Sequence, residues 1–131
     1  MKRLIAIFLL IAMAAGVSVA EAAPAKGSHL ANVPARDHAR QNPEAGKPHA
    51  LEAGAALYKD HCAECHKANG SGDGVKKPSL RTETVRSATD GDLEWFLRQG
   101  DLAHGMPSWS SLPQSQRWQI VLYLRSLQLQ K

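Results

Sequence analysis

The sequence predicts an all-α fold with about three main helices and long loops. Apolar residues recur at helical spacing in three stretches, and residues that start and stop helices lie at the ends of these stretches. No stretch shows the strict alternation of apolar and polar residues that is typical of a half-buried strand. Because the chain has 131 residues, we expect a single small domain.

The first predicted helix spans residues 49–61 and leads directly into a pair of cysteines. Leu51, Leu57 and Tyr58 supply apolar positions among good helix formers. Pro48 suits the first helical turn, where a backbone N–H is not needed.

The second predicted helix spans residues 90–98. Thr89 or Asp90 can supply its N-cap, and acidic residues fill its first turn, where the helix dipole favours negative charge. Gly100 follows and is a suitable helix stop.

The third predicted helix, residues 111–129, is the longest. Ser111 and Gln114 have the spacing of a capping box, and Pro113 suits the first turn. A wide apolar stripe predicts a buried face. Its members include Trp118, Val121, Leu122, Leu124 and Leu127.

Residues 67–86 and 101–111 are predicted loops. The glycines of residues 69–74 are typical of turns, and no lysine and hydroxyl residue follow them to complete a phosphate-binding loop. We expect this stretch to bring the backbone close around one edge of a bound group.

Residues 1–22 predict a secretory signal peptide. Lys2 and Arg3 give a positive start, and residues 4–17 are an almost unbroken apolar run. The run is shorter than the ~18 apolar residues typical of a membrane span. We expect cleavage near Ala22 and no stable membrane insertion, with an uncleaved anchor as the alternative.

Residues 23–47 predict a Pro- and Ala-rich linker or arm ahead of the domain at 48–131. Prolines interrupt the stretch, and no apolar periodicity is sustained. A mobile tether and an extended arm that wraps the domain both fit, and a docking tail is the functional alternative. We expect His29, His38 and His49 to be solvated.

Cys62-Ala63-Glu64-Cys65-His66 is the strongest chemical signal, since C-x-x-C-H is typical of covalent c-type haem attachment. The two thiols on one helical turn can each add to a vinyl group of the porphyrin. The imidazole of His66 then lies beneath the ring, where it can be the proximal ligand of the iron. Because c-type haem is attached outside the cytoplasm in bacteria, the motif and the signal peptide together predict a periplasmic protein.

Other interpretations of the motif lack their expected context. A thioredoxin-like redox pair expects a βαβ unit, which the pattern does not show. Half of a zinc site could draw on His61, His66 or His104, but a second Cys-x-x-Cys or His-x-x-x-His is missing. A plain structural disulfide between Cys62 and Cys65 is the remaining alternative.

Met106 is the predicted distal ligand of the iron. Met1 and Met13 lie in the predicted signal peptide, so Met106 would be the methionine of the mature chain. Filling a gap in the core is the commonest use of methionine, but the upstream C-x-x-C-H favours ligation. His104 is the competing ligand and would give a bis-histidine iron of lower potential.

The charge of the chain is mildly basic. Removal of residues 1–22 would leave 14 basic and 11 acidic residues, a net charge of +3. No basic stripe interleaved with aromatic residues indicates nucleic-acid binding. Basic residues that could steer acidic partners, or simply form a solvated face, are Lys67, Lys76, Lys77 and Arg81.

The order and spacing of these motifs resemble the small class I c-type cytochromes, above all bacterial periplasmic cytochromes with one haem. The resemblance covers about residues 42–127. The matching segments are Gly54-x-x-x-Tyr58, Cys62–His66, Gly70–Gly74, Pro78-Ser79-Leu80, Gly105-Met106-Pro107 and Val121–Leu127.

The resemblance implies a cytochrome c fold in which the first and last main helices cross closely. Gly54 would let the helices approach, and Tyr58 and Tyr123 would pack at the crossing. The carbonyl of Pro78 would accept a hydrogen bond from the ring N–H of His66 and so orient it.

The resemblance also implies a one-electron carrier that is not an enzyme, with periplasmic dehydrogenases, cytochrome complexes or terminal oxidases as redox partners. Two alternatives remain open: a haem enzyme or ligand sensor with an open sixth position, and a haem subunit of a larger complex. Lys67 departs from the glycine that many relatives carry after the motif, and we expect this to change only the local surface.

Overall fold

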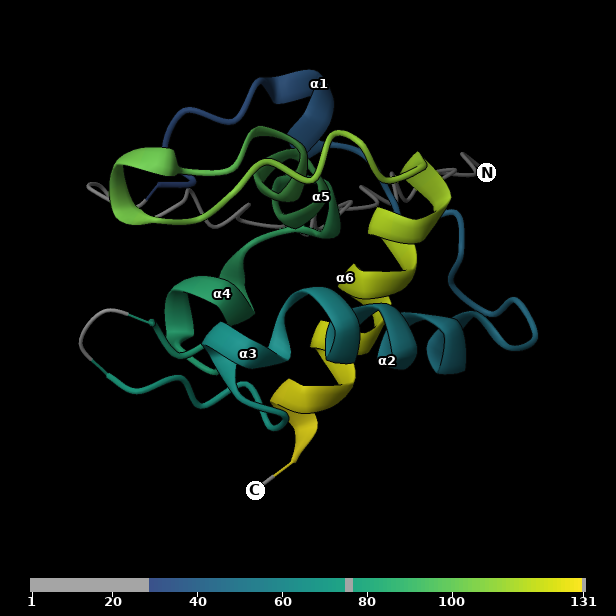
Figure 1. Cartoon of the computed structure of the whole chain (residues 1–131). Coiled ribbons are helices and arrows are strands. Elements are labelled where there is room, and N and C mark those ends of the chain that lie inside the picture. The colour runs from purple at the N-terminus through teal and green to yellow at the C-terminus, as the bar shows by residue number, and fades with distance from the viewer. Residues whose placement is uncertain (1–28, 75–76, 131) are drawn as a thin grey trace, which may run out of the picture.

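The computed structural model describes residues 29–74 and 77–130, and within them the chain is helical without a β-strand. The all-α prediction is therefore confirmed. The predicted signal peptide and Lys76 lie outside the described residues. Figure 1 labels the six α-helices. The elements are α1 Ala35–His38, α2 Ala50–His61, α3 Ala63–His66, α4 Glu83–Ser87, α5 Asp90–Gln99, the 3₁₀ helix η1 Leu102–His104 and α6 Gln114–Leu129.

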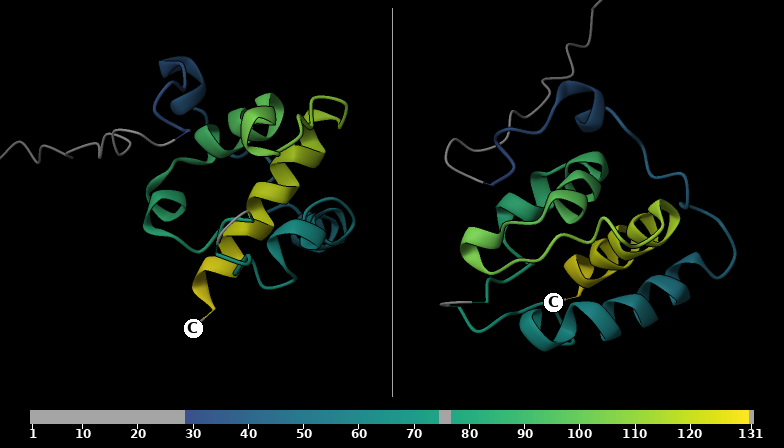
Figure 2. Two further views of the ribbon diagram at one scale, coloured as in Figure 1. Left: turned by 60° about the vertical axis from the view of Figure 1, so that its left-hand side comes forward. Right: turned by 45° about the horizontal axis from the view of Figure 1, so that its top comes forward.

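The predicted close crossing of α2 and α6 is present (Figures 1 and 2). A Cβ atom at Gly54 would lie 2.0 Å from the carbonyl oxygen of Gln119, so α2 can approach α6 this closely only because position 54 has no side chain. Beside it, the rings of Tyr58 and Tyr123 pack with their centroids 5.2 Å apart. Both tyrosines lie where the resemblance placed them.

The core lies between α2, α5 and α6. The predicted stripe of α6 is buried at Trp118, Val121, Leu124 and Leu127, and Leu122 is half-buried. Apolar residues from the other segments complete this core, and they include Leu30, Tyr58, Cys62, Leu93 and Leu97.

The N-terminus of α5 follows the prediction, whereas that of α6 does not. The Thr89 hydroxyl accepts from the N–H of Asp92, whose carboxylate accepts from the N–H of Thr89, forming a capping box. The capping box predicted at Ser111 is wrong. Pro113 has extended backbone angles and is the N-cap of α6, so Ser111 lies outside the helix, and no side chain caps it.

The predicted loop at residues 67–86 is wrong at its end, where α4 forms. The Thr82 hydroxyl accepts from the N–H of Val85, and the Glu83 and Arg86 side chains pair one turn apart. These local contacts are enough for a single turn of helix. Within the described residues, no helix has the length and apolar character that a membrane span requires.

Residues 29–47 are packed against α5 and α6. A Cβ atom at Gly91 would lie 1.9 Å from the Asp37 carbonyl oxygen, and the Asn42 side chain donates to the Trp118 carbonyl at 2.9 Å. The expectation that His38 is solvated is wrong, because its side chain is 21% exposed and its Nδ1 lies 2.9 Å from an Asp92 carboxylate oxygen.

Ion pairs fasten this segment to α5, and α5 in turn to α6. Arg40 lies 3.2 Å from the carboxylate of Glu94, and Arg117 of α6 lies 2.8 Å from the other oxygen of the same group. Glu94 is fully buried, so two guanidinium groups neutralise a charge that would otherwise be costly inside the protein. Arg98 pairs with Asp37 at 3.0 Å in the same way.

We expect Gly54→Ala to destabilise the protein by about 1–3 kcal/mol, because the added methyl overlaps the backbone of α6. Chemical denaturation of the haem-loaded protein measures the effect. Glu52→Ala is the control, since the Glu52 side chain is 85% exposed on the same helix. Equal or greater stability of Gly54→Ala, as helix propensity alone predicts, would contradict the role of this contact.

Candidate cofactor site at Cys62, Cys65 and His66

The C-x-x-C-H motif forms one helical turn at the end of α2. Helix α2 ends at His61, and the N–H groups of Cys65 and His66 both bond to the carbonyl of Cys62, at 3.1 and 2.9 Å. Both thiols are free, with Cys62 buried and Cys65 exposed. The turn therefore presents two unlinked thiols and an imidazole within five consecutive residues, and it does not form the disulfide considered as an alternative.

The environment of Cys62 keeps its thiol protonated. Burial, followed by the nearby charge of Cys65 when ionised, raises the pKa of Cys62 to about 12. Burial likewise raises the pKa of Tyr58 well above its usual value. The Tyr58 hydroxyl donates to the carbonyl of Lys67 at 2.8 Å, so it anchors the backbone directly after the motif.

His66 is buried and has one ring nitrogen already engaged. Its Nδ1 lies 2.9 Å from the carbonyl oxygen of Pro78, and a carbonyl only accepts, so Nδ1 carries the proton. In the neutral imidazole the other nitrogen, Nε2, has the lone pair and is the one available as a ligand.

Gly72 is what allows the Pro78 carbonyl to reach His66. The N–H of Gly72 donates to the His66 carbonyl at 3.0 Å, and a Cβ atom at Gly72 would lie 2.1 Å from the Lys77 carbonyl oxygen. Its φ of +63° also favours glycine. The sequence showed a glycine-rich turn here but not which glycine the contact needs.

Lys67 has a strained backbone that the sequence analysis missed. Its φ of 66° and ψ of 159° lie in a region that is essentially restricted to glycine. The departure from glycine at this position therefore affects the backbone as well as the surface. The sequence shows a lysine where many relatives have glycine, but only the backbone angles show that this lysine is strained.

Met106 lies on a separate loop that is fixed to the end of α5. Met106 and Asp101 exchange two backbone hydrogen bonds, of 2.8 and 2.9 Å, and the N–H of Trp109 bonds to the Leu97 carbonyl at 2.8 Å. A Cβ atom at Gly100 would lie 2.5 Å from the N atom of Ser108, so the loop packs closely on itself. These contacts hold the loop in one conformation.

The two parts of the candidate site meet at the core. The rings of His61 and Trp109 lie 4.9 Å apart, which joins the residue before the motif to the loop that carries Met106. Met106 is half-buried against the same hydrophobic cluster to which Cys62 belongs. The structure thus groups Cys62, Cys65, His66 and Pro78, and brings Met106 to the same core from a different segment.

His104 bonds to Asp101, and the described side chains that could share a zinc ion do not include the cysteines of the motif. The His104 side chain is 68% exposed and bonds through Nδ1 to Asp101. This bond, the largest cause, lowers the pKa of Asp101. Among the described residues, the side chains that gather closely enough to share a metal ion are His29, Asp101 and His104, and neither cysteine is one of them.

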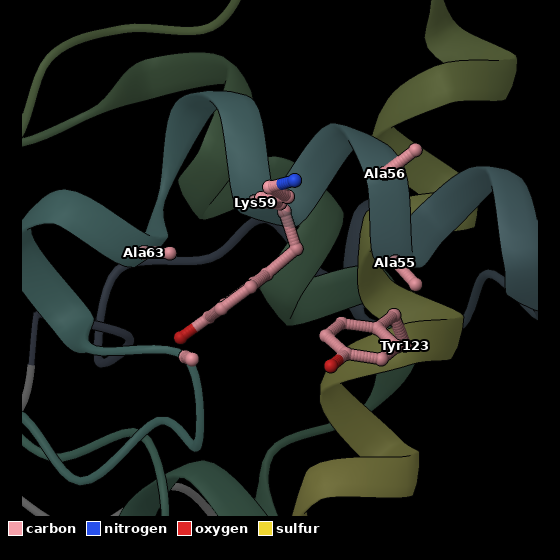
Figure 3. Close-up of a pocket in the computed structure, with 7 residues that line it drawn as sticks. Ala55, Ala56, Lys59, Ala63 and Tyr123 are labelled. Atoms are coloured by element: carbon pink, nitrogen blue, oxygen red, sulfur yellow. The ribbon is translucent and has the colours of Figure 1, made fainter.

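A hollow lies beside the crossing of α2 and α6 and reaches Ala63 of the motif. Figure 3 shows Ala55, Ala56, Lys59 and Ala63 along α2 and α3, and Tyr123 on α6. Its lining includes none of the predicted ligand residues. We therefore assign no role in cofactor binding to it.

A family model described as cytochrome C oxidase, cbb3-type, subunit III matches residues 49–124. The match covers more than half of the chain and spans both cysteines, His66, Pro78 and Met106. A comparison with curated proteins finds no match.

We expect Lys67→Gly to stabilise the protein by roughly 1–3 kcal/mol, because glycine adopts these backbone angles without strain. Thermal unfolding of the haem-loaded protein measures the change. Lys67→Ala is the matched control, since it removes the charge and keeps a Cβ atom. If both variants shift the unfolding temperature equally, the charge rather than the backbone is responsible.

Proposed function

Because the chain belongs to the cytochrome c oxidase, cbb3-type, subunit III family, which is a family of c-type cytochromes, we propose that it is a periplasmic one-electron carrier with a single haem c. The hydrogen bond from His66 Nδ1 to the Pro78 carbonyl, beside two free thiols, is the observation that carries this proposal. It leaves Nε2 of a buried imidazole free to act as an axial ligand.

The residues present fit a covalently attached haem. Cys62 and Cys65 would form the two thioethers, His66 would be the proximal ligand and Met106 the distal one. When bound, the haem supplies reversible one-electron oxidation and reduction of its iron. The donor set, two thiols with an imidazole and a thioether, is that of an electron-transfer cytochrome.

The protein would contribute rigidity and burial. The Pro78 carbonyl fixes the His66 ring, and the backbone pairing with Asp101 fixes the position of Met106. Ligands held from both sides change position little when the charge of a site changes, so little reorganisation accompanies electron transfer. This arrangement needs no catalytic side chain, which is why we assign electron transfer and not an enzymatic reaction.

Partners would be periplasmic redox proteins that dock weakly and briefly. Lys67 is exposed beside the motif, and Lys77 and Arg81 are half-buried in the following segment. These cations would favour an acidic docking surface on the partner. Export would depend on the signal peptide predicted at residues 1–22.

The family description favours one further candidate, a haem subunit held in a larger oxidase complex. Purification of the exported protein from its native membrane and periplasmic fractions separates the two. A stoichiometric partner that stays bound through gel filtration would indicate a subunit, and a monomer from the periplasmic fraction would indicate a free carrier.

We expect the wild-type protein to show a low-spin haem c spectrum, with a ferric iron–thioether band and no response to carbon monoxide. Met106→Ala is expected to lose that band and to bind carbon monoxide in the reduced state, because the distal position then opens. His104→Ala is the control and should match the wild type. A wild type that is high-spin or binds carbon monoxide would favour a haem enzyme or sensor.

We expect Gly72→Ala to raise the reduction potential. The added methyl displaces the segment at Lys77 and Pro78, which weakens the bond to His66 and makes this ligand less basic, so the ferric state is less stabilised. Gly74→Ala is the matched control, since it also has a positive φ but has no atom within 4 Å of the added Cβ. An unchanged potential in Gly72→Ala, at full haem content, would contradict this role of Pro78.

A further inference from the structure

Two histidines and an aspartate form a cluster outside the proposed haem ligands. His29 Nδ1 lies 2.5 Å from the Asp101 carboxylate, and His104 Nδ1 lies 2.9 Å from both of its oxygens. The two imidazole rings have centroids 4.6 Å apart. One ligand atom from each of the three residues lies within 4.8 Å of the others.

The cluster joins the segment of His29 to the distant segment of Asp101 and His104. Contacts with the rest of the fold fix both segments. The residue after His29, Leu30, is buried in the core, and the His29 ring packs near Phe96 of α5 at 6.3 Å. Asp101 is fixed by its backbone bonds to Met106, and the N–H of His104 bonds to the Asp101 carbonyl at 3.0 Å. His104 lies three residues after Asp101 in the same turn, whereas His29 reaches the pair only because the fold brings its segment there.

We propose that His29, Asp101 and His104 bind one divalent transition-metal ion, with Zn²⁺ as the best match. Two imidazoles and one carboxylate are a common zinc donor set, and the fourth position of a tetrahedral site would be taken by water. Hard cations such as Mg²⁺ and Ca²⁺ prefer sites made of oxygen ligands.

The exposure of the cluster fits a site that solution ions can reach. The side chains of His29 and His104 are 54% and 68% exposed, whereas that of Asp101 is 15% exposed. The carboxylate oxygens of Asp101 already face both rings, so the three side chains need little rearrangement to share an ion. Metal binding would replace the hydrogen bonds that the carboxylate now accepts from the two rings.

A bound ion would tie the N-terminal segment to the loop that carries Met106. Asp101 would then hold the metal through its side chain and Met106 through its backbone. The proposal concerns this cluster alone, so it stands or falls independently of the proposed electron-transfer function.

Isothermal titration of the haem-loaded, tag-free and chelator-treated protein with Zn²⁺ tests the proposal. We expect one equivalent to bind, and His29→Ala and His104→Ala each to weaken binding at least tenfold. His49→Ala is the control, because its side chain is 86% exposed and near Glu52, away from the cluster. An unchanged haem spectrum in each variant shows that the fold and the iron ligands are intact.

Two outcomes would overturn the proposal: absence of saturable Zn²⁺ binding to the wild type, or binding that His29→Ala and His104→Ala leave unchanged. A second readout is the unfolding temperature. We expect added Zn²⁺ to raise it in the wild type and in His49→Ala, because a ligand that binds the folded state stabilises it by mass action. The same addition should raise the unfolding temperature of His29→Ala less, and an equal rise in all variants would contradict the site.

Discussion

The close contact of α2 with α6 at Gly54 is the constraint on which the rest of the structure depends. It sets the distance between the two helices, and Tyr58, one turn further along α2, packs on Tyr123 and donates to the carbonyl of Lys67. The cysteines and His66 follow directly on α2. The position of the motif is therefore fixed by a backbone contact about two to three turns before it.

Helix α6 holds the other half of the molecule through charged side chains. Arg117 pairs with buried Glu94, and Arg125 bonds to the carboxylate of Asp90 and to the carbonyl of Ala88. These contacts orient α5, and the loop that carries Met106 follows α5 and bonds to its C-terminal end. The two groups of proposed iron ligands thus belong to different units, and α6 is the element that fixes one relative to the other.

The sequence allowed the main helices to be predicted because their signals are local. Apolar spacing, the N-cap at Thr89 or Asp90 and the C-x-x-C-H motif each depend on residues within a few positions of one another. The predicted cap of α6 failed although Ser111 and Gln114 have the right spacing, because Pro113 holds an extended conformation and starts the helix later.

An arm that wraps the domain was one of the two interpretations of the N-terminal segment, but its contacts could not be predicted, for the opposite reason. Its prolines and charges are typical of a linker, but Arg40 and His38 find their acidic partners 54 residues away in α5. His29 and Asp101 are likewise far apart in the sequence and meet only in the folded chain. Such contacts exist only once the helices are packed, and no pattern within a short window encodes them.

Strain at Lys67 persists because its surroundings determine the backbone from both sides. The N–H of Lys67 bonds to the Ala63 carbonyl within the motif, and its own carbonyl accepts the Tyr58 hydroxyl. Since burial raises the pKa of Tyr58, the hydroxyl keeps its proton at neutral and mildly alkaline pH and remains a donor. A hydrogen bond that does not titrate in this range, together with the rest of the folded motif, offsets the cost of a backbone conformation that a lysine otherwise avoids.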